Sequence, residues 1–375
     1  MSPHPALPLV LLALGHASAL FAQGDSARTT IGGYGEVHYT NDTGPGTPGE
    51  VNVERIVLYL GHSFSDRIAF RSELELEDAR IEGGADGGEL ALEQAYLDYR
   101  VGESTFIRTG LVLIPVGIIN ETHEPPTFNG VARPLFERDL IPATWREVGI
   151  GVAGTASTSA GLTYRVYLVN GLTADGFSGK TGIRGGRQGG QKATFANPSI
   201  TGRLEWARPG LRVGSSFWYG GSAAQDSVLG EGTFDAPVAL ASGDVRYDIG
   251  PWAFRGVLAW IGIADAGAIN SRDSTDVAER LWGGYVEGAV NLLRFLAPAS
   301  SQRVNLFGRY ERYDTHAKVP PGTVRVTAYD RSLTTIGLGY KPLWNVVFKA
   351  DYQIRRDAGD LDEGETVALG VGYQF

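Results

Sequence analysis

Three side chains able to exchange protons or bind metal lie close together in the sequence, at Glu121, His123 and Glu124. Carboxylate and imidazole groups can act as acids and bases, or ligate a divalent cation. Their spacing differs from the HExxH pattern, and Pro125 with Pro126 prevents a regular helix at this point. The chain also has no cysteine and no GxSxG motif. We therefore expect no metal site, no bound cofactor and no enzymatic activity.

The same region carries charges of both signs that could line a path for solutes. Within residues 114–146, Glu121 and His123 are followed by Arg133, Arg138 and Arg146. Apolar residues are interspersed with them: Val116, Ile118, Ile119, Phe128, Val131, Leu135, Phe136 and Ile141. A loop folded back against a barrel wall would bury these side chains and narrow the bore. We interpret 114–146 as a constriction loop, and the alternative is an ordered external cap that only seals the rim.

The segments before and after this loop alternate apolar and polar residues with the period of a β-strand. In 365–375 the apolar face consists of Val367, Leu369, Val371, Tyr373 and Phe375. In 68–79 the charged face includes Arg71, Glu73 and Glu75, opposite a face of apolar residues. Such alternation is typical of a strand with hydrocarbon on one side and water on the other. The alternation breaks near Glu93 and Gln94, where we expect a β-bulge.

Sixteen such segments predict an all-β, antiparallel, up-and-down transmembrane barrel. They lie near 31–40, 54–63, 68–80, 89–101, 105–113, 147–154, 162–170, 199–207, 211–220, 238–249, 252–262, 280–292, 303–313, 325–340, 345–356 and 365–375. Short turns, such as Lys341-Pro342-Leu343, alternate with long loops, which makes 114–146 the third external loop. We expect that loop to fold into the lumen. A barrel of this size has room for water inside.

Charges of the predicted wall would complete the constriction. The wall residues expected to shape it are Arg71, Glu73, Glu75 and Arg108, and both signs recur on the other strands. Rings of charge set the ion preference of a channel. The alternative is that these charges pair across neighbouring strands and stiffen a wet wall.

The N-terminus predicts export from the cytoplasm. Residues 7–14 form an apolar run, and Ala17-Ser18-Ala19 resembles a signal-peptidase site, so residues 1–22 read as a signal peptide cleaved after Ala19 or Ala22. Residues 23–375 then form the barrel, because no later stretch approaches a membrane-spanning helix. The net charge of −9 argues against nucleic acid as a partner.

Four segments resemble the phosphate-selective porin O/P family. They are RIVLYLGHSFSDRIAFRSELELEDA at 55–79, ALEQAYLDYR at 91–100, GLVLIPVGIINETHEPPTFNGV at 110–131 and IPATWREVGIGVAG at 141–154. The resemblance implies a sixteen-stranded channel, usually a homotrimer, in the bacterial outer membrane. Phosphate-specific members place an arginine ladder and a lysine cluster in the pore, whereas lysine occurs here only at 180, 192, 318, 341 and 349. We carry over the fold and the channel role, without the phosphate site.

The expected function is that of a porin in contact with outer-membrane lipid. Small hydrophilic solutes or inorganic ions, including anions such as phosphate, would diffuse passively through a water-filled pore. The competing interpretation is a structural, adhesive or enzymatic outer-membrane barrel with a plugged lumen.

Overall fold

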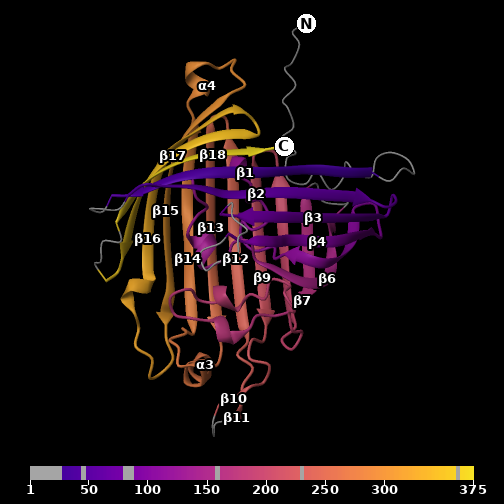
Figure 1. The fold of residues 1–375 in the computed structure, drawn as a ribbon, viewed down its shortest axis with the longest axis vertical. Coiled ribbons are helices and arrows are strands. Elements are labelled where there is room, and N and C mark those ends of the chain that lie inside the picture. Colours follow the sequence, from indigo (N-terminus) through magenta and orange to yellow (C-terminus); the bar gives the residue numbers. More distant parts are fainter. Residues whose placement is uncertain (1–27, 44–47, 79–87, 157–160, 229–231, 360–363) are drawn as a thin grey trace.

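Sixteen antiparallel strands close into one barrel in the computed structural model, which describes residues 28–43, 48–78, 88–156, 161–228, 232–359 and 364–375 (Figure 1). Neighbours in the barrel follow the order of the chain, and β1 pairs with β18 to complete it. The strands are β1 (Arg28–Asp42), β2 (Glu50–Ser63), β3 (Ile68–Glu77), β4 (Leu90–Arg100), β5 (Thr105–Leu113), β6 (Arg146–Thr155), β7 (Leu162–Val169), β8 (Ser199–Arg208), β9 (Leu211–Gly220), β12 (Val238–Ile249), β13 (Trp252–Ile263), β14 (Arg280–Asn291), β15 (Arg303–Lys318), β16 (Asp330–Leu343), β17 (Val346–Asp357) and β18 (Glu365–Gln374). The predicted fold class is confirmed.

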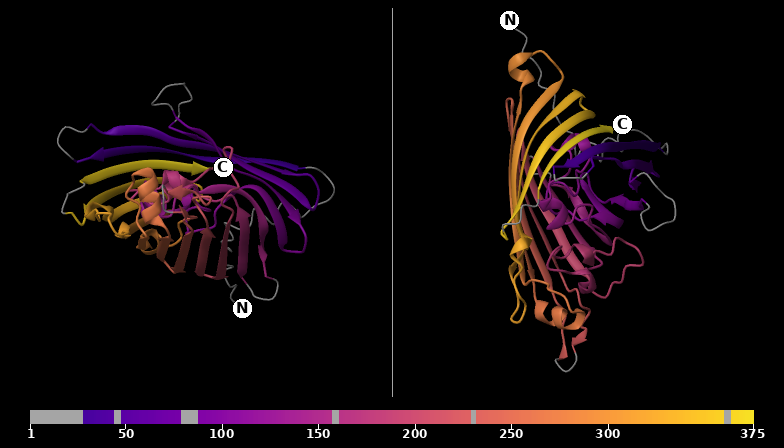
Figure 2. Two further views of the ribbon diagram at one scale, coloured as in Figure 1. Left: turned by 90° about the horizontal axis from the view of Figure 1, so that it is seen from below. Right: turned by 60° about the vertical axis from the view of Figure 1, so that its left-hand side comes forward.

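The described parts of the connections carry short elements. They are the hairpin of β10 (Ser227–Val228) and β11 (Gly232–Thr233), the helices α2 (Phe136–Asp139), α3 (Ala266–Asp273) and α4 (Leu293–Leu296), and the 3-10 turns η1 (Pro125–Thr127), η2 (Ala174–Gly176), η3 (Arg184–Gly186) and η4 (Thr327–Tyr329). Within the described ranges, no helix is both long enough and apolar enough to cross a bilayer. Seen from below, β1 and β2 lie opposite the strands from the middle of the chain (Figure 2).

The two faces of the strands differ sharply in chemistry. On β18, Thr366 and Ala368 are buried inside the barrel, while Val367 and Leu369 lie on the outer surface. Outward side chains elsewhere are also large and apolar, as at Leu258 of β13, which is 68% exposed. An exposed apolar surface of this kind is stable when hydrocarbon, not water, covers it.

Most strands lie where the sequence pattern placed them, with ends shifted by up to four residues, as at the start of β2, and the largest difference is around the loop between β15 and β16. β15 continues to Lys318, beyond the predicted end at 313, and β16 begins at Asp330 and not at 325. The pattern fails there because the polar residues Thr315 and His316 are fully buried beneath other loops. The predicted turn at 341–343 is also wrong, since Leu343 pairs with Val346 after a register shift.

The predicted bulge in β4 is confirmed. Glu73 of β3 pairs with Gln94, whereas the next residue, Leu74, pairs with Leu92, so Glu93 is the additional residue. The predicted signal peptide, residues 1–22 with its two cleavage points, lies outside the described residues, and the barrel begins at Arg28.

Candidate functional site

The third external loop, residues 114–145 between β5 and β6, fills part of the barrel interior. Its apolar side chains Ile114, Val116, Ile119 and Trp145 are almost completely buried. The loop reaches the far side of the barrel, where the backbone N–H of Val131 donates to Asp351 of β17 at 2.6 Å. A cap that only sealed the rim could not make this contact. The loop is therefore folded into the lumen, as the sequence indicated.

Cations from several parts of the barrel wall hold the loop through its backbone carbonyls and one aromatic ring. The contacts are Arg203 to Gly117 (3.2 Å), Arg255 to Thr127 (3.0 Å), Arg309 to Asn129 (3.3 Å), Lys341 to Pro126 (2.6 Å) and the Lys349 ammonium over the Phe128 ring (3.7 Å). Hydrogen bonds that involve a charged group are among the stronger ones. These cations, which come from five strands, are thus engaged in fixing the loop.

Glu137, on the short helix α2, is the central internal anchor of the loop. One carboxylate oxygen accepts the backbone N–H groups of Ile118 and Ile119 at 2.7 and 2.8 Å, and the other accepts the Tyr285 hydroxyl at 2.8 Å. Burial raises the pKa of Glu137 to about 7, because removal from water disfavours the ionised form; the accepted hydrogen bonds offset only part of this effect. The anchor joins two ends of the loop to the wall strand β14.

Two ion pairs, Arg108–Asp98 and Arg165–Glu121, lie on the β4–β7 side of the interior, the first of them beside Tyr96. Arg108 forms a bidentate pair with Asp98 at 2.8 and 2.9 Å, and its guanidinium lies 3.9 Å from the centre of the Tyr96 ring. Glu121, on the loop, pairs with Arg165 of β7 at 3.0 Å. The side chains of Arg108, Glu121 and Arg165 remain 17–24% exposed, so water reaches them.

Arg71 belongs to the same neighbourhood. Its partner in the β3–β4 ladder is Tyr96. The charges that act on the Tyr96 hydroxyl are those of Arg108, Asp98, Arg71 and Glu121. Three of the residues predicted to shape the constriction, Arg71, Arg108 and Glu121, are therefore brought together.

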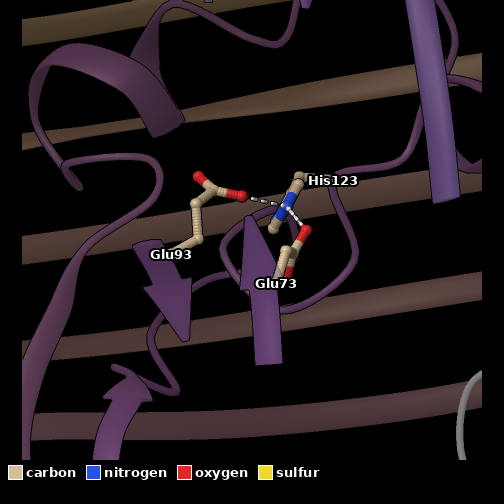
Figure 3. A group of neighbouring side chains, drawn as sticks. All are labelled: Glu73, Glu93 and His123. Carbon is tan, nitrogen blue, oxygen red and sulfur yellow. Dashed lines mark hydrogen bonds and ion pairs between the residues drawn. The ribbon is translucent and has the colours of Figure 1, made fainter. Parts of the chain in front are cut away.

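A second set of predicted residues meets deeper in the wall, around His123. Nε2 of His123 lies 3.3 Å from Glu73 Oε1 and 3.3 Å from Glu93 Oε2, and all three side chains are buried (Figure 3). Glu75 lies on the same strand as Glu73 and pairs with Arg55 at 2.7 Å. The guanidinium of Arg133 is also buried, and its charge acts on His123.

The other two predicted residues lie apart from both groups. Arg138 is half exposed and pairs with its neighbour Asp139 at 2.9 Å. Arg146, at the start of β6, lies 3.8 Å from Glu89 and donates to the carbonyl of Thr144.

Sequence reasoning did not select Glu93 as a site residue. It noticed the broken alternation at this position, which was the available signal, but not that the bulge turns Glu93 toward His123. Of the wall cations that hold the loop, Lys341 was assigned to a turn and the others were recognised only as inward charges, because their partners on the loop depend on the path of the loop.

Solved barrels of the outer membrane share this fold. Salmonella typhi OmpF, in complex with daunomycin, superposes with a TM-score of 0.62 and 13% identity over 94% of this chain and 98% of its own. The outer membrane channel DcaP of Acinetobacter baumannii gives 0.59 and 12%, covering 94% and 99%. The trimer form of Vibrio cholerae OmpT, an outer membrane protein, gives 0.56 and 11%, covering 94% and 100%.

A sequence relative is much more similar. An uncharacterized protein of Aquifex aeolicus (strain VF5) is 36% identical over 359 residues, which cover 92% of this chain and 80% of the relative. No family model matches the chain, so the resemblance to the phosphate-selective porins stays an expectation. The chain belongs to the same family as the Aquifex aeolicus protein.

Proposed function

We propose that this protein is a porin of the bacterial outer membrane, through which small hydrophilic or ionic solutes diffuse passively. The observation that carries the proposal is the two-sided barrel, with apolar side chains outside and ionised side chains inside. Hydrocarbon outside and water inside is the arrangement that stabilises both faces. The likeness to DcaP, described as an outer membrane channel, supports the same conclusion.

The solute path would be shaped by the predicted residues on the third loop and the adjacent wall. Arg71, Arg108 and Glu121 form its accessible part, and Glu73, Glu75, His123 and Arg133 fix the loop beside it. Arg138 and Arg146 would act nearer the loop's exposed edge. Since charges of both signs line this path, the positions of the individual charged side chains decide the ion preference.

Phosphate has no dedicated site in this proposal. The wall cations that could form a ladder for anions contact loop carbonyls and Phe128. Phosphate would pass as one small anion among other solutes.

The remaining elements of the proposal follow from export and assembly. Residues 1–22 would be removed as a signal peptide, and the apolar outer surface would contact outer-membrane lipid. A homotrimer is proposed, supported by the trimer form described for Vibrio cholerae OmpT. No enzymatic step is assigned.

A closed barrel is the competing function, and one observation favours it. The loop side chains Phe136 and Trp145 pack with Phe177, Ile183 and Trp218 in one continuous buried apolar cluster inside the barrel. Such packing could close the lumen and leave the protein a structural role.

Conductance in a planar bilayer decides between the two functions. We expect discrete conductance steps from the purified, folded protein. Glu121→Gln should move the reversal potential in a salt gradient toward anions, and Arg108→Gln should move it toward cations, because each removes one charge of opposite sign. Steps that appear only after residues 118–142 are replaced by a short Gly-Ser linker would establish the closed barrel instead.

A further inference from the structure

A buried cluster of Glu73, Glu93 and His123 connects the third loop to the barrel wall (Figure 3). Glu73 comes from β3, Glu93 from β4 and His123 from the loop. One ligand atom from each lies within 4.8 Å of the others, and their side chains are 1%, 0% and 3% exposed. Bulk water therefore does not solvate these groups.

Glu93 lacks the partners that a buried carboxylate needs. Among the described residues, neither of its oxygens has a nitrogen or hydroxyl donor, and its other neighbour is the Glu75 carboxyl, which is close enough to share a proton with it. Its single ion-pair contact is His123 Nε2, at 3.3 Å. Buried carboxylates are ordinarily hydrogen-bonded, paired or bound to metal, and with Glu73 and Glu75 close by, a cation bound at Glu93 would offset the crowding of like charges.

The ring of His123 is oriented for ligation. Its Nδ1 lies 3.0 Å from the carbonyl oxygen of Asn120, so Nδ1 carries the proton and donates it. In the neutral ring, Nε2 then directs its lone pair at two carboxylate oxygens. That arrangement is repulsive unless a proton or a metal cation lies between them, and it is the orientation that metal-binding histidines adopt.

The two separations from His123 Nε2 agree with those of a tetrahedral metal site. Zinc bonds to imidazole nitrogen and carboxylate oxygen are about 2.0–2.1 Å long, which places tetrahedral ligand atoms about 3.3–3.4 Å apart. Charge-assisted N–H···O bonds contract to about 2.7–2.9 Å. His123 Nε2 lies 3.3 Å from both carboxylates.

The bulge in β4 places the supporting groups. The extra residue lets Glu93 and Gln94 both approach Glu73, and Gln94 Nε2 donates to Glu73 Oε2 at 2.5 Å. This bond leaves Glu73 Oε1 directed at His123. Hydrogen bonds to the second oxygen of a ligating carboxylate are typical of metal sites.

The charge at the cluster also calls for a cation. The charges that act on His123 are those of Glu93 and Glu73, opposed by that of the buried Arg133. One divalent ion would balance the two carboxylates.

His38 offers an instructive contrast. Its Nε2 lies 3.2 Å from Glu36 and its Nδ1 lies 3.7 Å from Glu54. The two carboxylates therefore face opposite sides of the ring, and one ion cannot bridge them.

We propose that Glu73, Glu93 and His123 bind one divalent transition-metal ion of the zinc class, which fastens the third loop to strands β3 and β4. The three protein ligands leave a fourth position for water. Calcium is disfavoured, because it takes six to eight oxygen ligands at longer distances. Metal binding here is independent of whether the barrel conducts.

The test counts metal in the refolded protein. The chain is folded with excess Zn²⁺, desalted and analysed by mass spectrometry for zinc, with the heat-dependent shift of its gel mobility as the measure of folding. We expect about one zinc per folded wild-type chain and none in Glu93→Gln or His123→Gln. His38→Gln, the matched control, should retain the wild-type amount, and Ca²⁺ in excess should not displace zinc.

A cobalt spectrum gives a second readout. Co²⁺-loaded wild-type protein should show the visible absorption bands of a four-coordinate site, absent in Glu93→Gln, which preserves side-chain size and so should fold. Equal zinc in wild type and Glu93→Gln would overturn the proposal, as would a wild type without zinc. The cluster would then be an imidazolium held between two carboxylates.

Discussion

At the scale of single residues, Glu137 shows how burial and hydrogen bonding oppose each other. Its pKa is raised by burial from its usual value of 4.5 to about 7. A carboxyl with a raised folded-state pKa stabilises the fold below pH 4.5, and this contribution is lost as the pH rises through 7. The loss amounts to about 3 kcal/mol. We expect the unfolding free energy of Glu137→Gln to lack this decline when measured between pH 4 and pH 9.

Asp139→Asn is the control for this measurement. Asp139 lies on the same helix and accepts the Tyr313 hydroxyl at 2.9 Å, so its substitution also removes a loop carboxylate. The difference in unfolding free energy between wild type and Glu137→Gln should change with pH as the Glu137 carboxyl titrates. The control Asp139→Asn should show the same decline with pH as the wild type. Parallel curves for wild type and Glu137→Gln would refute the role assigned to Glu137.

The same scale explains which site residues the sequence could reveal. Glu121, His123 and Arg133 were recognisable because a charged loop rich in apolar residues must fold against something. Glu93 was not, since its role depends on a loop residue thirty positions away that only the folded path brings to the bulge. A sequence shows which residues are charged, but it does not show which distant residue each charge contacts in the folded chain.

At the scale of single strands, Gly110 controls the β4–β5 pairing beside the bulge. Its φ of +133° disfavours any side chain, and a Cβ there would collide with the Ala95 carbonyl and lie 2.8 Å from Tyr96 Cα. We expect Gly110→Ala to lower the unfolding free energy by about 1–3 kcal/mol. Denaturant titration in detergent, followed by tryptophan fluorescence, measures the change.

Gly308 of β15 is the matched control, because a Cβ added there meets nothing within 4 Å and its φ is not positive. Gly308→Ala should leave stability unchanged or raise it slightly, since alanine restricts the unfolded chain. If both variants lose stability equally, the strain at Gly110 is not the cause.

Strand positions were predictable wherever a strand separates two solvents. The period of two survives in β3, β17 and β18, because each residue there faces either the outer surface or the interior. It disappears at the end of β15, where the consecutive residues Thr315 and His316 are both buried under loops. In a regular barrel strand, one of two consecutive residues would face outward and the other inward. Strand ends beyond the apolar band follow loop packing, which no alternation encodes.

At the scale of the whole molecule, the proposal depends on hydrocarbon surrounding the barrel. Leu258, near the middle of β13, is 68% exposed, and Val324, in the loop before β16, is 81% exposed. Exposure alone does not distinguish them. In a bilayer, however, the first position meets lipid and the second meets water.

We therefore expect Leu258→Arg to lower the unfolding free energy in lipid vesicles by about 2–4 kcal/mol, the cost of an arginine near the bilayer midplane. Val324→Arg adds the same charge outside the apolar band and should change stability little, because its guanidinium stays hydrated. Urea titration of both variants in the same vesicles gives the comparison. Equal stability would mean that the outer surface at β13 does not face hydrocarbon, and the membrane barrel would lose its physical basis.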